Sequence, residues 1–160
     1  GVVECAAVGL PAGLGAPFFE GVEAVMAAQL FSIPAVKGVE FGAGFAAAAL
    51  RGSEYNDPYV MSDGRVATAR NSAGGLLGGI ASGMPIIVRA AFRPTPSISL
   101  EQQTVSLSQK APTSLAVRGR HDPCVAVRAV PVVEGAVALA LLELWLERRA
   151  SFPLATRAGL

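Results

Sequence analysis

The sequence predicts a mixed fold of α-helices and β-strands, about one domain in size. Segments with the apolar spacing of helices alternate with strand-like segments, and no fixed repeat joins them. Of the 160 residues, 52% are hydrophobic and only 16% are charged, well below the roughly 25% of an average soluble domain. Most elements should therefore be buried on more than one side, as in a dense oligomer or a part of a larger fold.

The N-terminal third is expected to contain a strand, a helix and a second strand. The chain opens with Gly1 inside the strand-like run GVVECAAVG, and we expect it to begin within a longer protein. From Phe18 the apolar positions follow helical spacing until Pro34 ends the helix. These positions are Val22, Val25, Met26, Leu30 and Ile33. The run VKGVEF is the next expected strand.

The middle of the chain is expected to be more irregular. FAAAAL is predicted to be a short helix, and RGSEYNDPYVMSDGR reads as an exposed loop rich in turn formers. A glycine-rich segment, NSAGGLLGGIASGMP, precedes a strand from Pro85 to Phe92. Alternation places Arg89, Ala91 and Arg93 on one face of that strand. A proline-rich loop and a stretch that could form a hairpin follow.

The last apolar run, from Ala129 to Leu146, is barely long enough to span a membrane, and Pro131, Glu134 and Glu143 interrupt it. We interpret it as a buried helix with Pro131 in its first turn and Pro153 at its stop.

The charge distribution predicts an anionic ligand. The net charge of +1 argues against a dedicated nucleic-acid or membrane-surface protein. Acidic residues dominate up to residue 64, but basic residues dominate from Pro85 to Val130. The basic residues there are Arg89, Arg93, Lys110, Arg118, Arg120 and Arg128.

Metal and redox chemistry are not indicated. Cys5 and Cys124 form no CxxC pair, so two reduced thiols in a cytosolic protein are expected. His121 and Cys124 could supply half of a zinc site, but a structural zinc needs four ligands. We predict no metal, and no signal peptide is visible.

Two glycine-rich stretches differ in what they indicate. AVGLPAGLGAPF has two glycines of a dinucleotide-binding fingerprint, but Phe18 occupies the third position, so such a site is not expected. NSAGGLLGGIASGMP has two equal interpretations. Its glycines either permit close backbone approach and left-handed turns, or they keep a bare backbone surface for a flat or phosphorylated ligand.

Two further motifs carry polar groups suited to anions. In RPTPS, Arg93 to Ser97, prolines stiffen an extended loop that carries hydroxyls suited to a phosphate. In GRHDPC, Gly119 to Cys124, Arg120 suits a carboxylate or phosphate and Asp122 lies two residues on. A simple salt bridge and a core histidine remain alternatives. These residues alone predict an anion site with an acid nearby.

Five blocks in order resemble the C-terminal part of the chorismate synthase family, from about Gly9 to about Leu146. They are GLGAPFFE, SIPAVKGVEFGAGF, LRGSEYND, NSAGGLLGGIASGMPIIVRAAFRPTPSI and GRHDPCVAVRAVPVVEGAVALALLELWL. The resemblance implies an α+β fold, a layered β-α-β sandwich with antiparallel sheets around central helices. It also implies a homotetramer. The cysteines and the net charge add the expectation of a cytoplasmic protein that binds neither nucleic acid nor membrane.

The resemblance implies a lyase of the shikimate pathway. It converts 5-enolpyruvylshikimate 3-phosphate into chorismate and phosphate by 1,4-anti elimination and needs reduced FMN. NADPH is implied only where the full-length enzyme reduces its own flavin. Asp122 is the implied catalytic residue, an acid near flavin N5 that assists proton removal, and His121 is a weaker candidate. The implied flavin contacts are Pro34, Ala35, Gly78, Arg93, Pro94, Thr95, Pro96, Ser97 and Arg120.

The resemblance further implies that residues 1–160 are a single partial domain without the N-terminal half of the family. The two acting histidines of the family belong to that half, so we expect no catalysis by this chain alone. Two alternatives remain open. The chain could be a non-catalytic module that binds FMN or another mononucleotide, or a fragment that serves oligomer packing only.

Overall fold

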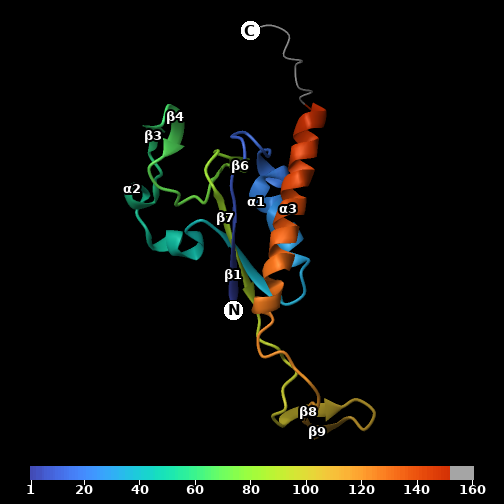
Figure 1. Cartoon of the computed structure of the whole chain (residues 1–160). Helices are drawn as coiled ribbons and strands as arrows, with labels where there is room; N and C mark the ends of the chain where they lie inside the picture. Colours follow the sequence, from blue (N-terminus) through green and yellow to red (C-terminus); the bar gives the residue numbers. More distant parts are fainter. Residues whose placement is uncertain (152–160) are drawn as a thin grey trace.

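The structure is a computed structural model that describes residues 1–151, and it centres on a three-stranded antiparallel sheet. The central strand is β7 (Ile86–Phe92), and β1 (Val2–Ala7) and β2 (Val36–Phe41) pair with its two edges. Helices α1 (Val22–Phe31) and α3 (Ala126–Ser151) pack on one another and on one side of the sheet (Figure 1). The predicted α+β class with antiparallel sheets is confirmed, with one sheet layer and one helix layer among the described residues.

The core lies between β7 and the two helices. Burial alternates along β7, so Ile86, Val88, Ala90 and Phe92 face the helices while Arg89 lies on the other face, as the alternation predicts. The residues that complete this core are Val3, Leu14, Val22, Met26, Leu30, Val36, Leu76, Ala81, Ala126, Ala129, Val133, Val137, Ala140 and Leu144. The core therefore fixes which side of β7 remains available to polar groups.

Helix α3 differs from its prediction in two ways. It begins at Ala126, because the buried Ala126 and Ala129 anchor a turn ahead of Pro131, so the placement of Pro131 in the first turn is wrong. The helix is also buried on one stripe only. By length and composition alone it could cross a membrane, but that stripe packs on β1 and α1. Its exposed apolar residues include Val127, Val130, Val132, Leu139, Leu142, Trp145 and Leu146. The predicted stop at Pro153 lies outside the described residues.

Residues 44–68 contain more regular secondary structure than the sequence predicts. The short helix predicted at FAAAAL is confirmed as a 3₁₀ helix, η2 (Gly44–Ala49), which ends one residue before Leu50. A second 3₁₀ turn, η1 (Phe18–Glu20), precedes α1. The expected loop is exposed, but it contains α2 (Gly52–Tyr55) and the hairpin of β3 (Tyr59–Ser62) and β4 (Arg65–Thr68). The expectation of a plain loop is wrong because Asp63 and Gly64, both at positive φ, form a two-residue hairpin turn.

Two more hairpins complete the fold. The expected hairpin after the proline-rich loop is confirmed as β8 (Gln102–Ser106) and β9 (Ala111–Leu115), which project away from the sheet and helices (Figure 1). The glycine-rich segment contains a short hairpin of β5 (Leu76–Leu77) and β6 (Ile80–Ala81).

Close backbone approach explains part of the glycine-rich segment. A Cβ on Gly74 would lie 2.4 Å from the backbone N of Gly42, and a Cβ on Gly42 would lie 2.3 Å from the carbonyl O of Ser72. Gly78, in the turn between β5 and β6, would meet nothing within 4 Å. The structural interpretation therefore accounts for both glycines: close backbone approach explains Gly74, and a left-handed turn explains Gly78, which has a φ of 61°.

Asp57 ties the α2 segment to the glycine-rich segment. Its carboxylate accepts hydrogen bonds from the amides of Ser72 and Ala73, each at 2.9 Å. Partial burial opposes ionisation, but these amides and the nearby Arg70 outweigh it and lower the pKa of Asp57 below its ordinary value of 3.8. Asp57 therefore stabilises the folded chain as an anion.

We expect Gly42→Ala to lower the free energy of unfolding by about 3–5 kcal/mol, because a left-handed backbone and a backbone clash combine at this position. Gly64→Ala is the matched control, since Gly64 also has a positive φ but an added Cβ meets nothing within 4 Å. The control should cost only about 1–2 kcal/mol. Urea unfolding measures both, and equal losses would contradict the close approach of residues 42 and 74.

We expect Asp57→Asn to destabilise the chain near neutral pH and to lose that effect in acid. Because the folded-state pKa is lowered, the stabilisation is complete above the unfolded-state pKa and disappears as the pH falls through the folded-state pKa. Urea unfolding from pH 7 down to about pH 2.5 measures this. Asp63→Asn, in the exposed hairpin turn, controls for the loss of one charge. A constant difference between wild type and Asp57→Asn would contradict the prediction.

Candidate functional site

Two of the predicted flavin-contact segments meet where β7 ends. The amide of Arg93, the first residue after β7, donates a hydrogen bond to the carbonyl O of Ala35 at 2.9 Å. Pro34 and Ala35 connect α1 to β2, and Ala35 has a φ of 74°, an uncommon value for a residue other than glycine. The pairing of β2 with β7 thus brings residues 34–35 against the RPTPS loop.

The third predicted segment joins the same place. The hydroxyl of Thr95 donates to the main-chain O of Asp122 at 2.8 Å, which ties RPTPS to GRHDPC. These two hydrogen bonds bring three segments together where β7 ends. We call them the β7-end surface, which comprises Pro34, Ala35, Arg93 to Ser97, and Arg120 to Asp122. Residues far apart in the sequence meet here because β2 pairs with the end of β7. The start of α3 lies beside Gly1, whose carbonyl O accepts from the amide of Phe92 at 2.8 Å.

The β7-end surface is cationic. Its Arg93 and Arg120 are exposed, as is the adjoining Arg128 of α3. The one carboxylate of the surface, Asp122, accepts a hydrogen bond from Nη1 of Arg128 at 2.7 Å. The Asp122 side chain is 42% exposed, so a ligand can still reach it. Guanidinium forks suit a phosphate or carboxylate, and the hydroxyls of Thr95 and Ser97 add further donors.

His121 lies next to this pair. Its Nε2 is buried and has no hydrogen-bond partner in the part of the chain that the structure describes. A buried polar atom of this kind calls for a partner. The donor set of the β7-end surface, with this orphaned nitrogen beside it, fits a flat phosphorylated molecule such as FMN.

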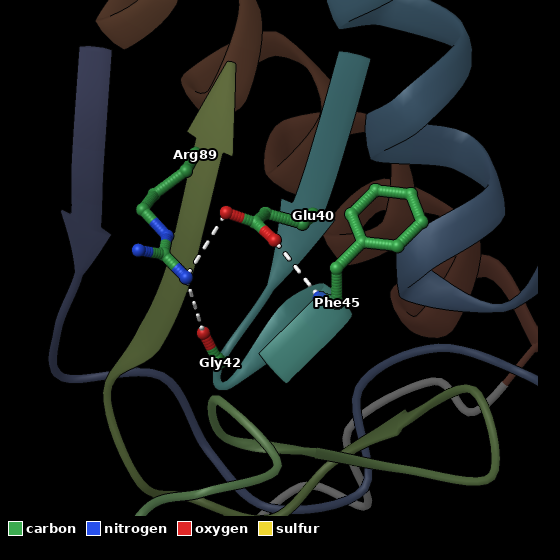
Figure 2. Close-up of polar contacts among 4 residues, drawn as sticks. All are labelled: Glu40, Gly42, Phe45 and Arg89. Carbon is green, nitrogen blue, oxygen red and sulfur yellow. Dashed lines mark hydrogen bonds and ion pairs between the residues drawn. The ribbon is translucent and has the colours of Figure 1, made fainter. Parts of the chain in front are cut away.

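Arg89 does not contribute to this cationic surface, although the sequence places it on the same face as Arg93. Figure 2 shows the Arg89 guanidinium between Glu40 and the main-chain O of Gly42, at 3.0 Å and 3.4 Å. The second oxygen of Glu40 accepts from the amide of Phe45 at 3.0 Å. Arg89 and Glu40 therefore hold η2 on the sheet, and Arg89 is neutralised before any ligand arrives.

Gly78 is not brought to the β7-end surface within one chain. The carbonyl O of its neighbour Gly79 accepts from the amide of Val22 at the start of α1, whereas Ala35 follows the end of α1. Gly78 and Ala35 thus lie at opposite ends of this helix. A cleft of about 420 Å³ lies beside the β5–β6 hairpin and is lined by Ala12, Tyr59, Val66, Leu77, Ile80, Ala81 and Ser82, but not by Gly78 itself.

A second cleft contains none of the predicted site residues. It has a volume of about 400 Å³ and lies between residues 13–16 and the last turns of α3. No group of three His, Cys, Asp or Glu residues that could hold a metal occurs among residues 1–151. Cys5 and Cys124 are free thiols, and partial burial together with Glu134 raises the pKa of Cys5.

Sequence reasoning missed two contacts at this site. The Thr95 hydroxyl bond to Asp122 has no sequence signal, because 27 positions separate the residues. The Arg128 contact had a weak signal, since Arg128 belongs to the basic cluster and follows Asp122 by six positions at a helix start.

Comparison with known proteins places the chain among relatives of one kind. Residues 1–146 match the family model for chorismate synthase. The chorismate synthase of Thermococcus kodakarensis is 54% identical over 150 residues, which are 94% of this chain and 42% of that protein. That of Pyrococcus abyssi is 56% identical over 149 residues, 93% of this chain and 42% of that protein.

A solved structure agrees with these matches. The crystal structure of a chorismate synthase superposes with a TM-score of 0.70 at 35% identity, over 92% of this chain and 38% of that one. The chain spans about two-fifths of the length of the curated relatives it matches, 42% in the two cases above. By the family model, the sequence identities and the fold, the chain belongs to the chorismate synthase family.

Proposed function

We propose that this chain is the C-terminal part of a chorismate synthase, a lyase of aromatic amino acid biosynthesis. Its substrate is 5-enolpyruvylshikimate 3-phosphate, and its products are chorismate and phosphate. The observation that carries this proposal is the β7-end surface, where the amide of Arg93 donates to the carbonyl O of Ala35 and the hydroxyl of Thr95 donates to the main-chain O of Asp122. We infer the reaction from membership of the family. The guanidinium groups and hydroxyls of this surface are hydrogen-bond donors suited to a phosphorylated ligand.

The residues of the chain bind and orient rather than form covalent bonds. Reduced FMN, when bound, supplies the electron density for a 1,4-anti elimination without net redox change. Arg93 and Arg120 bind anionic oxygens through their guanidinium forks. Pro34, Ala35, Pro94, Pro96 and Ser97 form a rigid surface for the flavin. Asp122, exposed beside them, assists proton removal at its carboxylate.

Further features of the whole protein belong to the same proposal. We expect a cytoplasmic homotetramer, with NADPH required only if the whole protein reduces its own flavin. Because Gly78 lies at the far end of α1, its predicted contact with FMN needs a flavin seated elsewhere than the β7-end surface of the same chain. Gly78 therefore stands as the least supported of the predicted flavin contacts.

We expect the purified chain to bind reduced FMN in an anaerobic fluorescence titration, and Arg120→Ala to weaken that binding about 10- to 100-fold, because a charge-assisted hydrogen bond is lost. Arg65→Ala, in β4, is the matched control and should bind like wild type. We expect no chorismate from the chain alone. Equal FMN binding by Arg120→Ala and wild type would contradict the placement of FMN at Arg120. Turnover by the chain alone would contradict the proposal that the active site also needs the N-terminal half of the family.

We expect Thr95→Val to weaken FMN binding about 3- to 10-fold, because the hydroxyl bond that ties RPTPS to Asp122 is lost while the branched shape remains. Thr104→Val, on the exposed strand β8, controls for loss of a hydroxyl. The same titration measures both variants. Unchanged binding by Thr95→Val would show that the two loops do not need this bond to form one surface.

A further inference from the structure

We propose that Arg128 is a positioning residue that fixes the orientation of the Asp122 carboxylate, an inference that rests on the proposed function. Nη1 of Arg128 donates to Oδ2 of Asp122 at 2.7 Å. Among residues 1–151 no hydrogen bond joins the other oxygen, Oδ1, which is therefore left to act on a ligand. A charge-assisted bond of this length favours one orientation of the acid over the others.

The main chain of Arg128 is held in place by the packing of α3. It lies in the first turn of α3, where its amide donates to the carbonyl O of Val125 at 3.0 Å. Its neighbours Ala126 and Ala129 are buried in the core. The position of its main chain is therefore set by the packing of α3 on the sheet, and its side chain reaches back six residues to Asp122.

Asp122 lies by contrast in an irregular segment. The hydroxyl of Thr95 holds its main-chain O at 2.8 Å, which restrains the backbone but leaves the side chain free to rotate. Among residues 1–151, the Asp122 carboxylate itself is restrained by one hydrogen bond, which Arg128 donates. Groups that act on a reacting atom need such support from a fixed neighbour.

Stability does not explain this ion pair. The Arg128 side chain is 69% exposed and the Asp122 side chain is 42% exposed. Exposed ion pairs contribute little to folding. An exposed pair between a rigid helix and the predicted catalytic acid is better explained by its effect on the orientation of the carboxylate. Its small contribution to folding stability distinguishes a positioning role from a structural one.

The test uses the full-length enzyme that carries this sequence, with saturating reduced FMN. Steady-state kcat and KM are measured for Arg128→Ala, Arg128→Lys, Asp122→Asn, and the double variant Arg128→Ala with Asp122→Asn. We expect Arg128→Ala to lower kcat about 10- to 100-fold, while KM changes less than about threefold and Tm stays within about 2 °C. Arg128→Lys should recover part of kcat, because the charge remains while the fork is lost.

The double variant tests most directly whether Arg128 acts through Asp122. Once the carboxylate is gone, removing Arg128 should cause no further loss of kcat, because two residues that act as a unit are not additive. Arg149→Ala, an exposed arginine in the last turns of α3, is the matched control and should retain wild-type kcat.

The outcomes separate the inference from the proposed function. Wild-type kcat in Arg128→Ala, or an equal further loss in the double variant, overturns the positioning role and leaves the proposed function in place. A large fall in Tm with loss of FMN binding in Arg128→Ala also overturns it, by showing a structural role. Wild-type kcat in Asp122→Asn overturns the roles of both Asp122 and Arg128 while the enzyme remains a chorismate synthase. No chorismate from the wild-type enzyme overturns the proposed function and the inference with it.

Discussion

The antiparallel pairing of β7 between β1 and β2 is the constraint on which the rest of the structure depends. Because side chains alternate along β7, one face carries Ile86, Val88, Ala90 and Phe92 into the core with α1 and α3. The register of β2 on β7 then sets Ala35 beside Arg93, where β7 ends. A slip of one residue would bury Arg89 and expose the apolar face, so the pairing and the site are fixed together.

The different roles of Arg89, Arg93 and Arg120 follow from the same geometry. Arg89 lies within the sheet, where Glu40 and the main-chain O of Gly42 satisfy it. Arg93 lies beyond the last pair of the sheet, and Arg120 lies on an irregular segment, so both remain exposed. Arg89, inside the main sheet, thus serves structure, and Arg93 and Arg120, beyond its end, are available to an anionic ligand.

The sequence predicted the three strands of the main sheet and both main helices, because their apolar periodicity is strong. The α+β class was an implication of the resemblance to the family. It missed the β3–β4 hairpin, since an Asp-Gly pair in a polar segment resembles any turn until both residues are seen at positive φ. It also misjudged α3, because an apolar run does not reveal which of its faces finds a partner. For the site, motifs found the residues, but only tertiary pairing could show that Gly78 lies apart from Ala35.

Mapping of FMN on the folded chain by two-dimensional ¹⁵N NMR shows whether the β7-end surface is the flavin-binding face. We expect amide shift changes on addition of FMN at Ala35, at Arg93, Thr95 and Ser97, and in the segment around Asp122, with the β3–β4 hairpin unaffected. Changes confined to the cleft between residues 13–16 and the end of α3 would contradict this expectation.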